Sequence, residues 1–213
     1  MRHSLVLAIA GFVAVSAPPA FADLLKFDFE GHGDLIPITN DYAGLVFSNA
    51  ATIVTGAAGG SGNEGEFPPR SGVTVAFNTG APMSIKFSAP ILNFSGYFNY
   101  NAALTLKAFS GSNALVDTEN SSFGSNLALS GELGSAPNEL VSLASAGGIS
   151  RVEISIDDFI DLNGSAGPGT FTLDDLSITT PDITSVPEVS SVVLLATIAG
   201  LVFLLQRSRH AVD

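Results

Sequence analysis

Hydrophobic and polar residues alternate in short runs through the middle of the chain. Leu24–Glu30 alternates throughout, and within Arg151–Ile156 the residues Val152, Ile154 and Ile156 fall on one face. A period of two residues is typical of a β-strand with one buried and one solvated face. Gly, Pro, Asn and Ser bound these runs, and no convincing amphipathic helix interrupts them. The pattern therefore predicts an all-β domain.

The domain is expected to contain about eleven strands and two long loops. The predicted strands are residues 24–30, 44–48, 51–55, 72–79, 83–88, 93–100, 103–110, 114–118, 140–144, 149–156 and 170–179. Residues 56–70 and 120–138 are predicted to form the long loops, which in compact β domains are often functional. Many short strands of this kind predict an antiparallel β-sandwich, jelly-roll-like, over residues 23–180.

The N-terminus has the pattern of a secretory signal peptide. Arg2 precedes an apolar run of about a dozen residues, which is too short to span a membrane comfortably. Ala20 and Ala22 supply small residues at the two positions that signal cleavage requires, which predicts cleavage before Asp23. Residues 1–22 are thus expected to direct export and to be removed.

The C-terminus has three parts that follow a short linker. The linker spans residues 181–185, and the three parts are an extended motif at 186–189, an apolar stretch at 190–205 and a polar, basic cluster at 206–210. Counted from Val189, the apolar stretch has 17 residues. As a helix it is about 25 Å long, the lower limit for a transmembrane span. The positive-inside rule would keep Arg207 and Arg209 in the cytoplasm, which leaves the domain outside.

This tail resembles the PEP-CTERM sorting signal. The resemblance covers residues 186–209 and rests on Val186, Pro187, Glu188, the short apolar helix, Arg207 and Arg209. It implies recognition by an exosortase, a membrane transpeptidase-like enzyme, while the chain is held transiently at the inner membrane. It also implies a Gram-negative producer of exopolysaccharide or biofilm, with the protein ending at the cell surface or in the extracellular matrix.

The tail departs from the family pattern in two ways. Val189 stands where the family usually has a second proline, and the basic cluster holds two arginines with four residues after it. No LPxTG-type motif is present, which argues against Gram-positive wall sorting. The segments FDFE near the start of the domain and FTLDDLSI near its end also resemble the jelly-roll ectodomains that are common in proteins with this tail.

The resemblance to jelly-roll domains implies a structural calcium ion. In a jelly roll the first and last strands often lie side by side, which would bring Asp28 and Glu30 near Asp174 or Asp175. Carboxylate and carbonyl oxygens are the ligands that Ca²⁺ prefers. Asp174 and Asp175 face opposite ways in a regular strand, so at most one of them would point at a shared site. The alternative is that these acids are solvated strand ends.

Acidic residues outnumber basic ones, and the net charge is −12. Between residues 23 and 185 there are 18 acidic and 5 basic residues, a balance of −13. A polyanionic surface repels phosphate backbones and argues against nucleic acid as a partner, whereas it suits solubility and divalent cations. The absence of cysteine excludes thiol catalysis, cysteine-ligated zinc and disulfides.

No catalytic constellation stands out in the sequence. His32 is the one histidine between residues 23 and 180, and a lone histidine beside glycines is usually inert. No G-x-S-x-G nucleophile motif is present. A glycosidase would need two carboxylates across a sugar cleft. The acids available for such a pair are Glu30, Asp157, Asp158, Asp174 and Asp175.

Carbohydrate binding is another activity to weigh. Tyr42, Tyr97 and Tyr100 are the tyrosines that would stack on sugar rings, and Asn99 and Asn101 would bond to hydroxyl groups. The face of this segment that the alternation predicts to be buried contains Phe94, Gly96, Phe98 and Tyr100. Tyr97 lies on the other face and is therefore the tyrosine expected to be exposed.

These patterns predict a non-enzymatic, exported β-sandwich protein whose work is structural or adhesive in an extracellular matrix. The alternative is a polysaccharide-active hydrolase or lectin of the same architecture. A hydrolase predicts two carboxylates facing one cleft, whereas an adhesive or matrix protein predicts a shallow surface without such a pair.

Overall fold

A computed structural model of the chain describes residues 23–80, 82–160 and 166–181. The predicted signal peptide at residues 1–22 and the predicted sorting tail at 186–209 lie outside them. Across the described ranges, Gly56–Ala58 forms a short 3₁₀ helix, η1. No helix in these ranges has the length and hydropathy that a membrane crossing requires.

The described residues form twelve β-strands, and every pair of strands is antiparallel. They are β1 (Asp23–Phe27), β2 (Ile36–Pro37), β3 (Leu45–Ser48), β4 (Ala50–Val54), β5 (Thr74–Asn78), β6 (Met83–Tyr100), β7 (Leu104–Phe109), β8 (Leu115–Asn120), β9 (Glu139–Ile156), β10 (Phe159–Ile160), β11 (Ala166–Gly167) and β12 (Phe171–Thr180). The prediction of an all-β domain is confirmed.

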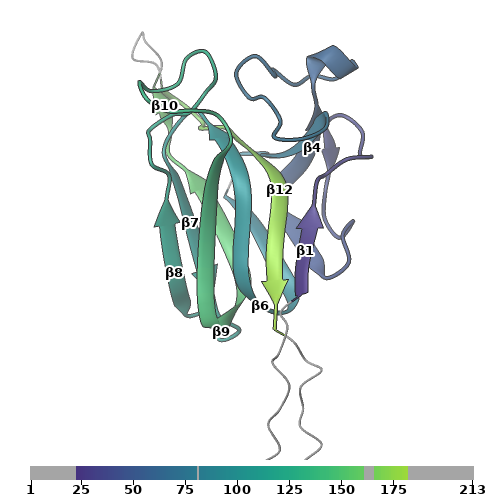
Figure 1. Cartoon of the computed structure of the whole chain (residues 1–213), viewed down its shortest axis with the longest axis vertical. Coiled ribbons are helices and arrows are strands. Elements are labelled where there is room, and N and C mark those ends of the chain that lie inside the picture. Colours follow the sequence, from purple (N-terminus) through teal and green to yellow (C-terminus); the bar gives the residue numbers. More distant parts are fainter. Residues whose placement is uncertain (1–22, 81, 161–165, 182–213) are drawn as a thin grey trace, which may run out of the picture. The chain divides into compact units, whose positions relative to one another are not determined.

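Ten of these strands belong to one hydrogen-bonded sheet. Its order is β2-β4-β5-β12-β6-β9-β7-β8, with β1 paired to β12 and β3 paired to β6, whereas β10 and β11 form a separate pair. The large sheet folds over on itself, so that two layers pack face to face around one core (Figure 1). The predicted antiparallel, sandwich-like architecture is therefore confirmed.

The two longest strands, β6 and β9, pass through both layers. The first part of β6, at residues 84–87, pairs with β3, whereas its last part pairs with β12. Both parts pair with β9, and the ladder is irregular around Ile91 and Ile149, which lie opposite each other. Along each strand the buried positions change there from odd-numbered to even-numbered residues. The irregularity therefore lets one strand present its apolar side to the core in both layers.

This irregularity explains the main difference from the predicted elements. The sequence predicts separate strands at 83–88 and 93–100, and again at 140–144 and 149–156, because the alternation breaks between them. The structure joins each pair into one bent strand of 18 residues. Three strands of two residues each, β2, β10 and β11, are too short to leave a pattern and were not predicted.

The core is aromatic-rich and forms one cluster between the layers. Its largest fully buried side chains include Phe29, Phe47, Phe94, Phe98, Tyr100 and Phe171. Val152 and Ile154 are fully buried, which confirms the face predicted for that segment. A core of this size replaces the disulfide bonds that a chain without cysteine cannot form.

The first and last strands place both ends of the domain together. β1 and β12 pair so that Asp23 lies opposite Thr180. β12 has ten residues and therefore spans about 30 Å, so Phe171 lies near the other end of the molecule. Figure 1 shows η1 and the loop around it at that other end, away from Asp23 and Thr180.

Replacement of Gly148 by alanine is expected to destabilise the fold. Gly148 has a φ of +89°, and an added Cβ would lie 2.8 Å from Cβ of Pro90. Strained backbone and the close contact together cost about 1–3 kcal/mol in the free energy of unfolding. The neighbouring Gly147 is the matched control, because the nearest atom to its added Cβ, Oγ of Ser145, is 3.8 Å away. Urea unfolding of both variants checks this, and equal losses would contradict it.

Candidate functional site

The loop at residues 55–73, which joins β4 to β5, folds back over the outer face of its layer. The outward-facing positions beneath it are Ile53, Val75, Phe77, Thr172, Asp174, Tyr97 and Asn99. Val75, Asn99 and Asp174 are 5%, 1% and 1% exposed, although they point away from the core. We infer that the loop covers them, so a segment predicted to be a loose loop is a packed part of the domain.

Asp174 on β12 holds the last part of this loop. Its Oδ2 accepts hydrogen bonds from the backbone N–H groups of Arg70 at 2.7 Å and Ser71 at 2.9 Å. Its Oδ1 accepts a third from the N–H of Asp175 at 2.7 Å, and the Ser71 hydroxyl donates to Oδ1 of Asp175 at 2.9 Å. Hydrogen bonds to an ionised acceptor are about twice as strong as neutral ones, so the loop is firmly attached here.

Glu30, which follows β1, holds the adjoining residues. Its Oε1 accepts hydrogen bonds from the N–H groups of Val73 and Thr74, both at 2.8 Å. Gly72 has a φ of +58°, and a Cβ added there would collide with the Glu30 carboxylate. Glycine therefore lets this side chain reach the backbone. Asp174, Glu30 and residues 70–74 together are called the carboxylate clamp below.

A bulge in β12 allows both Asp174 and Asp175 to bond to Ser71. The register of β12 on β6 shifts between Asp174 and Ser177, and Asp175 has a φ of +46°. The next residue after Leu173 that faces the core is therefore Leu176, whereas a regular strand would place Asp175 there. In a regular strand only one aspartate would face this side. The bulge removes that restriction, since both side chains bond to Ser71.

Asp174 is the ionisable group most affected by its surroundings here. Burial raises its pKa to about 6, and the negative charge of Asp175 acts in the same direction. Backbone hydrogen bonds from Ser71, Asp175 and Arg70 act against this rise. The side chain is therefore ionised at neutral pH and takes up a proton in mild acid, because burial disfavours its charge by more than the backbone hydrogen bonds favour it.

Two further carboxylates hold the beginning of the 55–73 loop. Oε2 and Oε1 of Glu64 accept the N–H groups of Gly56 and Ala57, each at 2.9 Å. Oδ2 of Asp34 accepts the hydroxyl of Ser61 at 2.6 Å. The loop is thus attached to carboxylates at its beginning as well as at its end.

The 55–73 loop also contacts the second long loop, residues 121–138. Oε2 of Glu66 accepts the N–H groups of Leu129 and Ser130, both at 3.1 Å. Asn126, which is fully buried, joins the second loop to the core by exchanging hydrogen bonds with the backbone of Phe98 and Tyr100 in β6. The two loops therefore order each other at one end of the sandwich.

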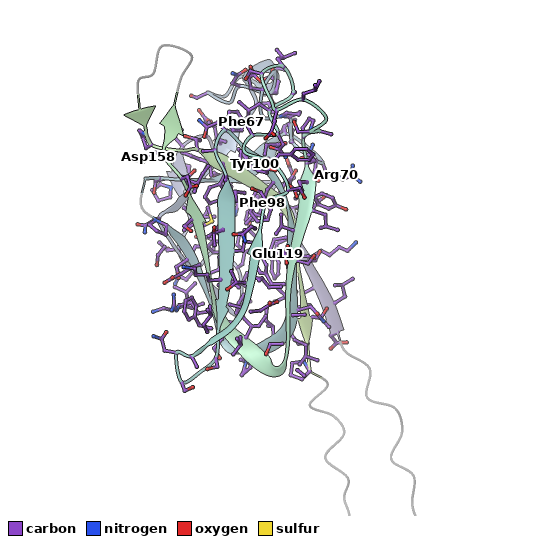
Figure 2. The ribbon with its side chains drawn as sticks, turned by 90° about the vertical axis from the view of Figure 1, so that its left-hand side faces the viewer. Phe67, Arg70, Phe98, Tyr100, Glu119 and Asp158 are labelled. Carbon is purple, nitrogen blue, oxygen red and sulfur yellow. The ribbon has the colours of Figure 1, made fainter. Side chains whose placement is uncertain are left out.

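A pocket of about 180 Å³ lies between the 55–73 loop and the sheet. Its apolar lining consists of Ile53, Val75, Phe77, Phe67 and Pro69, from β4, β5 and the loop. Figure 2 shows Phe67 and Arg70 at the end of the domain away from the start of β1. This pocket is the strongest candidate site within the described residues.

The predicted calcium ligands lie near one another but face backbone groups. Glu30, Asp174 and Asp175 all bond to residues 71–74, whereas Oδ1 of Asp28 accepts the N–H of Glu30 at 3.1 Å. Within the described ranges, no group of three or more acidic or histidine side chains is placed to hold a metal ion. A structural calcium ion stays a prediction from the sequence, and it would have to compete with these N–H donors.

The residues predicted to bind sugar are engaged within the protein. Tyr97 is half-buried, and the Arg70 guanidinium carbon lies 4.8 Å from its ring centroid. Asn99, considered above as a partner for sugar hydroxyl groups, is buried and bonds to Pro68 and Asn138. Oδ1 of Asn101 accepts the N–H of residue 170 at 2.7 Å. The Arg70 guanidinium therefore takes one face of the Tyr97 ring, the face on which a sugar would have to compete with it.

Of the other two tyrosines, Tyr100 lies in the core and Tyr42 packs against it half-buried. Tyr100 is fully buried and donates to the Glu139 carboxylate, and burial together with this bond raises its pKa. Tyr42 packs among Phe27, Phe29 and Phe47, with the ring of His32 5.4 Å away. Burial raises the pKa of Tyr42 to about 12. The histidine therefore lies against an aromatic cluster.

Comparison with known proteins adds no name to this site. No protein-family model matches the chain, and no curated protein matches it.

Sequence reasoning missed most of the residues that build the site. Asp34, Glu64, Glu66 and Asn126 are single polar residues in loops, and no spacing marks them as anchors. Gly72 is the one local signal, because a glycine at the predicted start of a strand, residues 72–79, indicates a backbone that a side chain approaches closely.

The pH dependence of stability is expected to report on Asp174. Its folded-state pKa of about 6 lies above the unfolded value of 3.8, so the folded protein binds more protons between pH 4 and 6. The resulting stabilisation, up to about 3 kcal/mol, is present below pH 4 and is lost as pH rises through 6. Urea unfolding of wild type and Asp174→Asn from pH 4 to 7 should show their difference changing by this amount.

The control for this measurement is Asp158→Asn, which removes an exposed aspartate near β10 (Figure 2). Its profile should run parallel to that of the wild type. Parallel profiles for Asp174→Asn and the wild type would contradict the role given to Asp174.

Proposed function

We propose that this chain is an exported protein that an exosortase sorts to the cell surface or extracellular matrix of a Gram-negative bacterium, where its β-sandwich does structural or adhesive work. The tripartite tail at residues 186–209 is the observation that carries the proposal. The signal-peptide pattern at residues 1–22 supports it, because a chain that crosses the inner membrane can meet an exosortase there.

The geometry of the domain is compatible with such a tether. Since Asp23 and Thr180 lie opposite each other, the first and last strands bring both termini of the domain to the same end. The two long loops lie at the other end (Figure 1), and residues of the 55–73 loop line the pocket. A domain held by its C-terminus would therefore turn its loops outward.

The chemistry of the described residues supports binding or structural work over hydrolysis. Glu30 and Asp174, two of the acids considered for a glycosidase pair, are occupied by the backbone of residues 70–74. The pocket has an apolar lining and includes one carboxylate, that of Glu64. Glycoside hydrolysis requires two carboxyl groups across the scissile bond. A jelly-roll arrangement of the strands is the finer form of the fold that we propose.

Replacement of Pro187 and Glu188 by alanine is expected to block processing. Both residues belong to the motif that an exosortase would read, so the double variant should accumulate unprocessed in the inner membrane. Cell fractionation and immunoblotting of the native producer measure the ratio of precursor to released protein, and we expect at least tenfold more precursor for the variant.

The matched control is the double replacement Pro181→Ala and Asp182→Ala, which removes the same kinds of residue a few positions earlier. This variant should be processed like the wild type. Normal release of the variant at residues 187 and 188 would show that the sorting proposal is wrong.

A further inference from the structure

The pocket under the 55–73 loop is built to hold one apolar group. Ile53, Val75 and Phe77 form a floor on the sheet, and Phe67 and Pro69 come from the loop above it. Its volume of about 180 Å³ is smaller than the roughly 300–1,000 Å³ of pockets that enclose whole ligands. A volume of this size suits a single side chain, as in the anchor pockets of protein interfaces.

The surroundings of the pocket are negatively charged. Glu64 lines it, and Asp34 bonds to Ser61 on its edge. Hydrogen bonds from the Ser61 hydroxyl and from Val54 lower the pKa of Asp34. The backbone N–H groups of Glu64 itself, Gly56 and Ala57 donate hydrogen bonds that lower the pKa of the Glu64 side chain. Both groups therefore stay ionised in mild acid, and an occupant with positive charge beside its apolar group is favoured.

We propose that this pocket receives one aromatic or branched aliphatic side chain from a basic segment of a partner protein. The inference goes beyond the sorting proposal and does not depend on it, since it rests on residues of the domain alone. It gives the domain a specific contact at the end away from Asp23 and Thr180.

Other occupants fit the pocket less well. A sugar needs hydrogen-bonding groups, yet the Ser61 hydroxyl donates to Asp34 and both Glu64 oxygens accept backbone N–H groups. Thr172 is 5% exposed and already lies 3.3 Å from the Asn99 amide. A second copy of this chain carries the same charge of −12 and would be repelled.

Short blocked peptides test the proposal directly. The probe is Gly-Lys-Phe-Lys-Gly, and its comparators are Gly-Lys-Ala-Lys-Gly and Gly-Gln-Phe-Gln-Gly. Methyl NMR of the full chain in lipid nanodiscs follows the Ile53 and Val75 methyl signals during titration. We expect the first peptide to bind at least about tenfold more tightly than either comparator, because it alone offers both the ring and the charge. Its binding should weaken with added salt.

Three variants locate the binding. Ile53→Trp fills the pocket and should abolish the shift of the Val75 signals. Phe67→Ala removes the loop's aromatic contribution to the pocket and should also abolish the shift, so it replaces the first variant if that variant does not fold. Glu64→Gln should weaken binding of the basic peptide about threefold or more. Glu119→Gln is the matched control, because it removes the same charge from exposed β8 at the far end of the strand order.

Each outcome decides the matter. Equal binding of the Phe and Ala peptides, no methyl shift, or binding that survives Ile53→Trp and Phe67→Ala would overturn the proposal. Tighter binding of a neutral oligosaccharide series at the Ile53 and Val75 methyl groups would assign the pocket to carbohydrate instead. Loss of sorting in the variant at residues 187 and 188 leaves this binding unchanged, so the two proposals fail separately.

Discussion

Hydrogen bonds from backbone N–H groups to carboxylates hold this domain's loops in place. The side chains that accept them are Asp28, Glu30, Asp34, Asp41, Glu64, Glu66, Glu132, Glu139 and Asp174. Loops lack the regular ladders that satisfy backbone groups in strands. In this chain an ionised oxygen takes the place of the missing ladder partner, and each such bond is stronger than a neutral one.

This use of carboxylates accounts for the acidic composition. Within the described ranges, the one salt bridge joins Arg151 and Glu153, so most of the acids are not there to pair with cations. Their charge is stabilised by backbone dipoles instead. The same arrangement occupies the oxygens that a metal ion or a catalytic proton transfer would need. An excess of Asp and Glu in a cysteine-free β domain is here chiefly a means of ordering loops.

The pocket exists because of the carboxylate clamp. Its floor belongs to the sheet, whereas Phe67 and Pro69 are kept above it by a loop that carboxylates hold near both ends. Asp174 and Glu30 come from the last and first strands, which also carry the ends of the domain. The element that connects the domain to its tail thus also shapes the candidate binding site at the other end.

Local pattern was enough to predict the all-β class, the sandwich-like layers and most of the strand segments, because each period-two run records which side chains meet the core. It also marked the signal-peptide and tail patterns, which depend on composition over consecutive residues. The tertiary structure decided what contiguous pattern cannot encode. Residues 70–74 meet Glu30 and Asp174 across some 40 and 100 positions, and the bend at Ile91 and Ile149 joins strands that look separate. Such contacts depend on where the folded chain brings distant groups together, and a single sequence records only the groups.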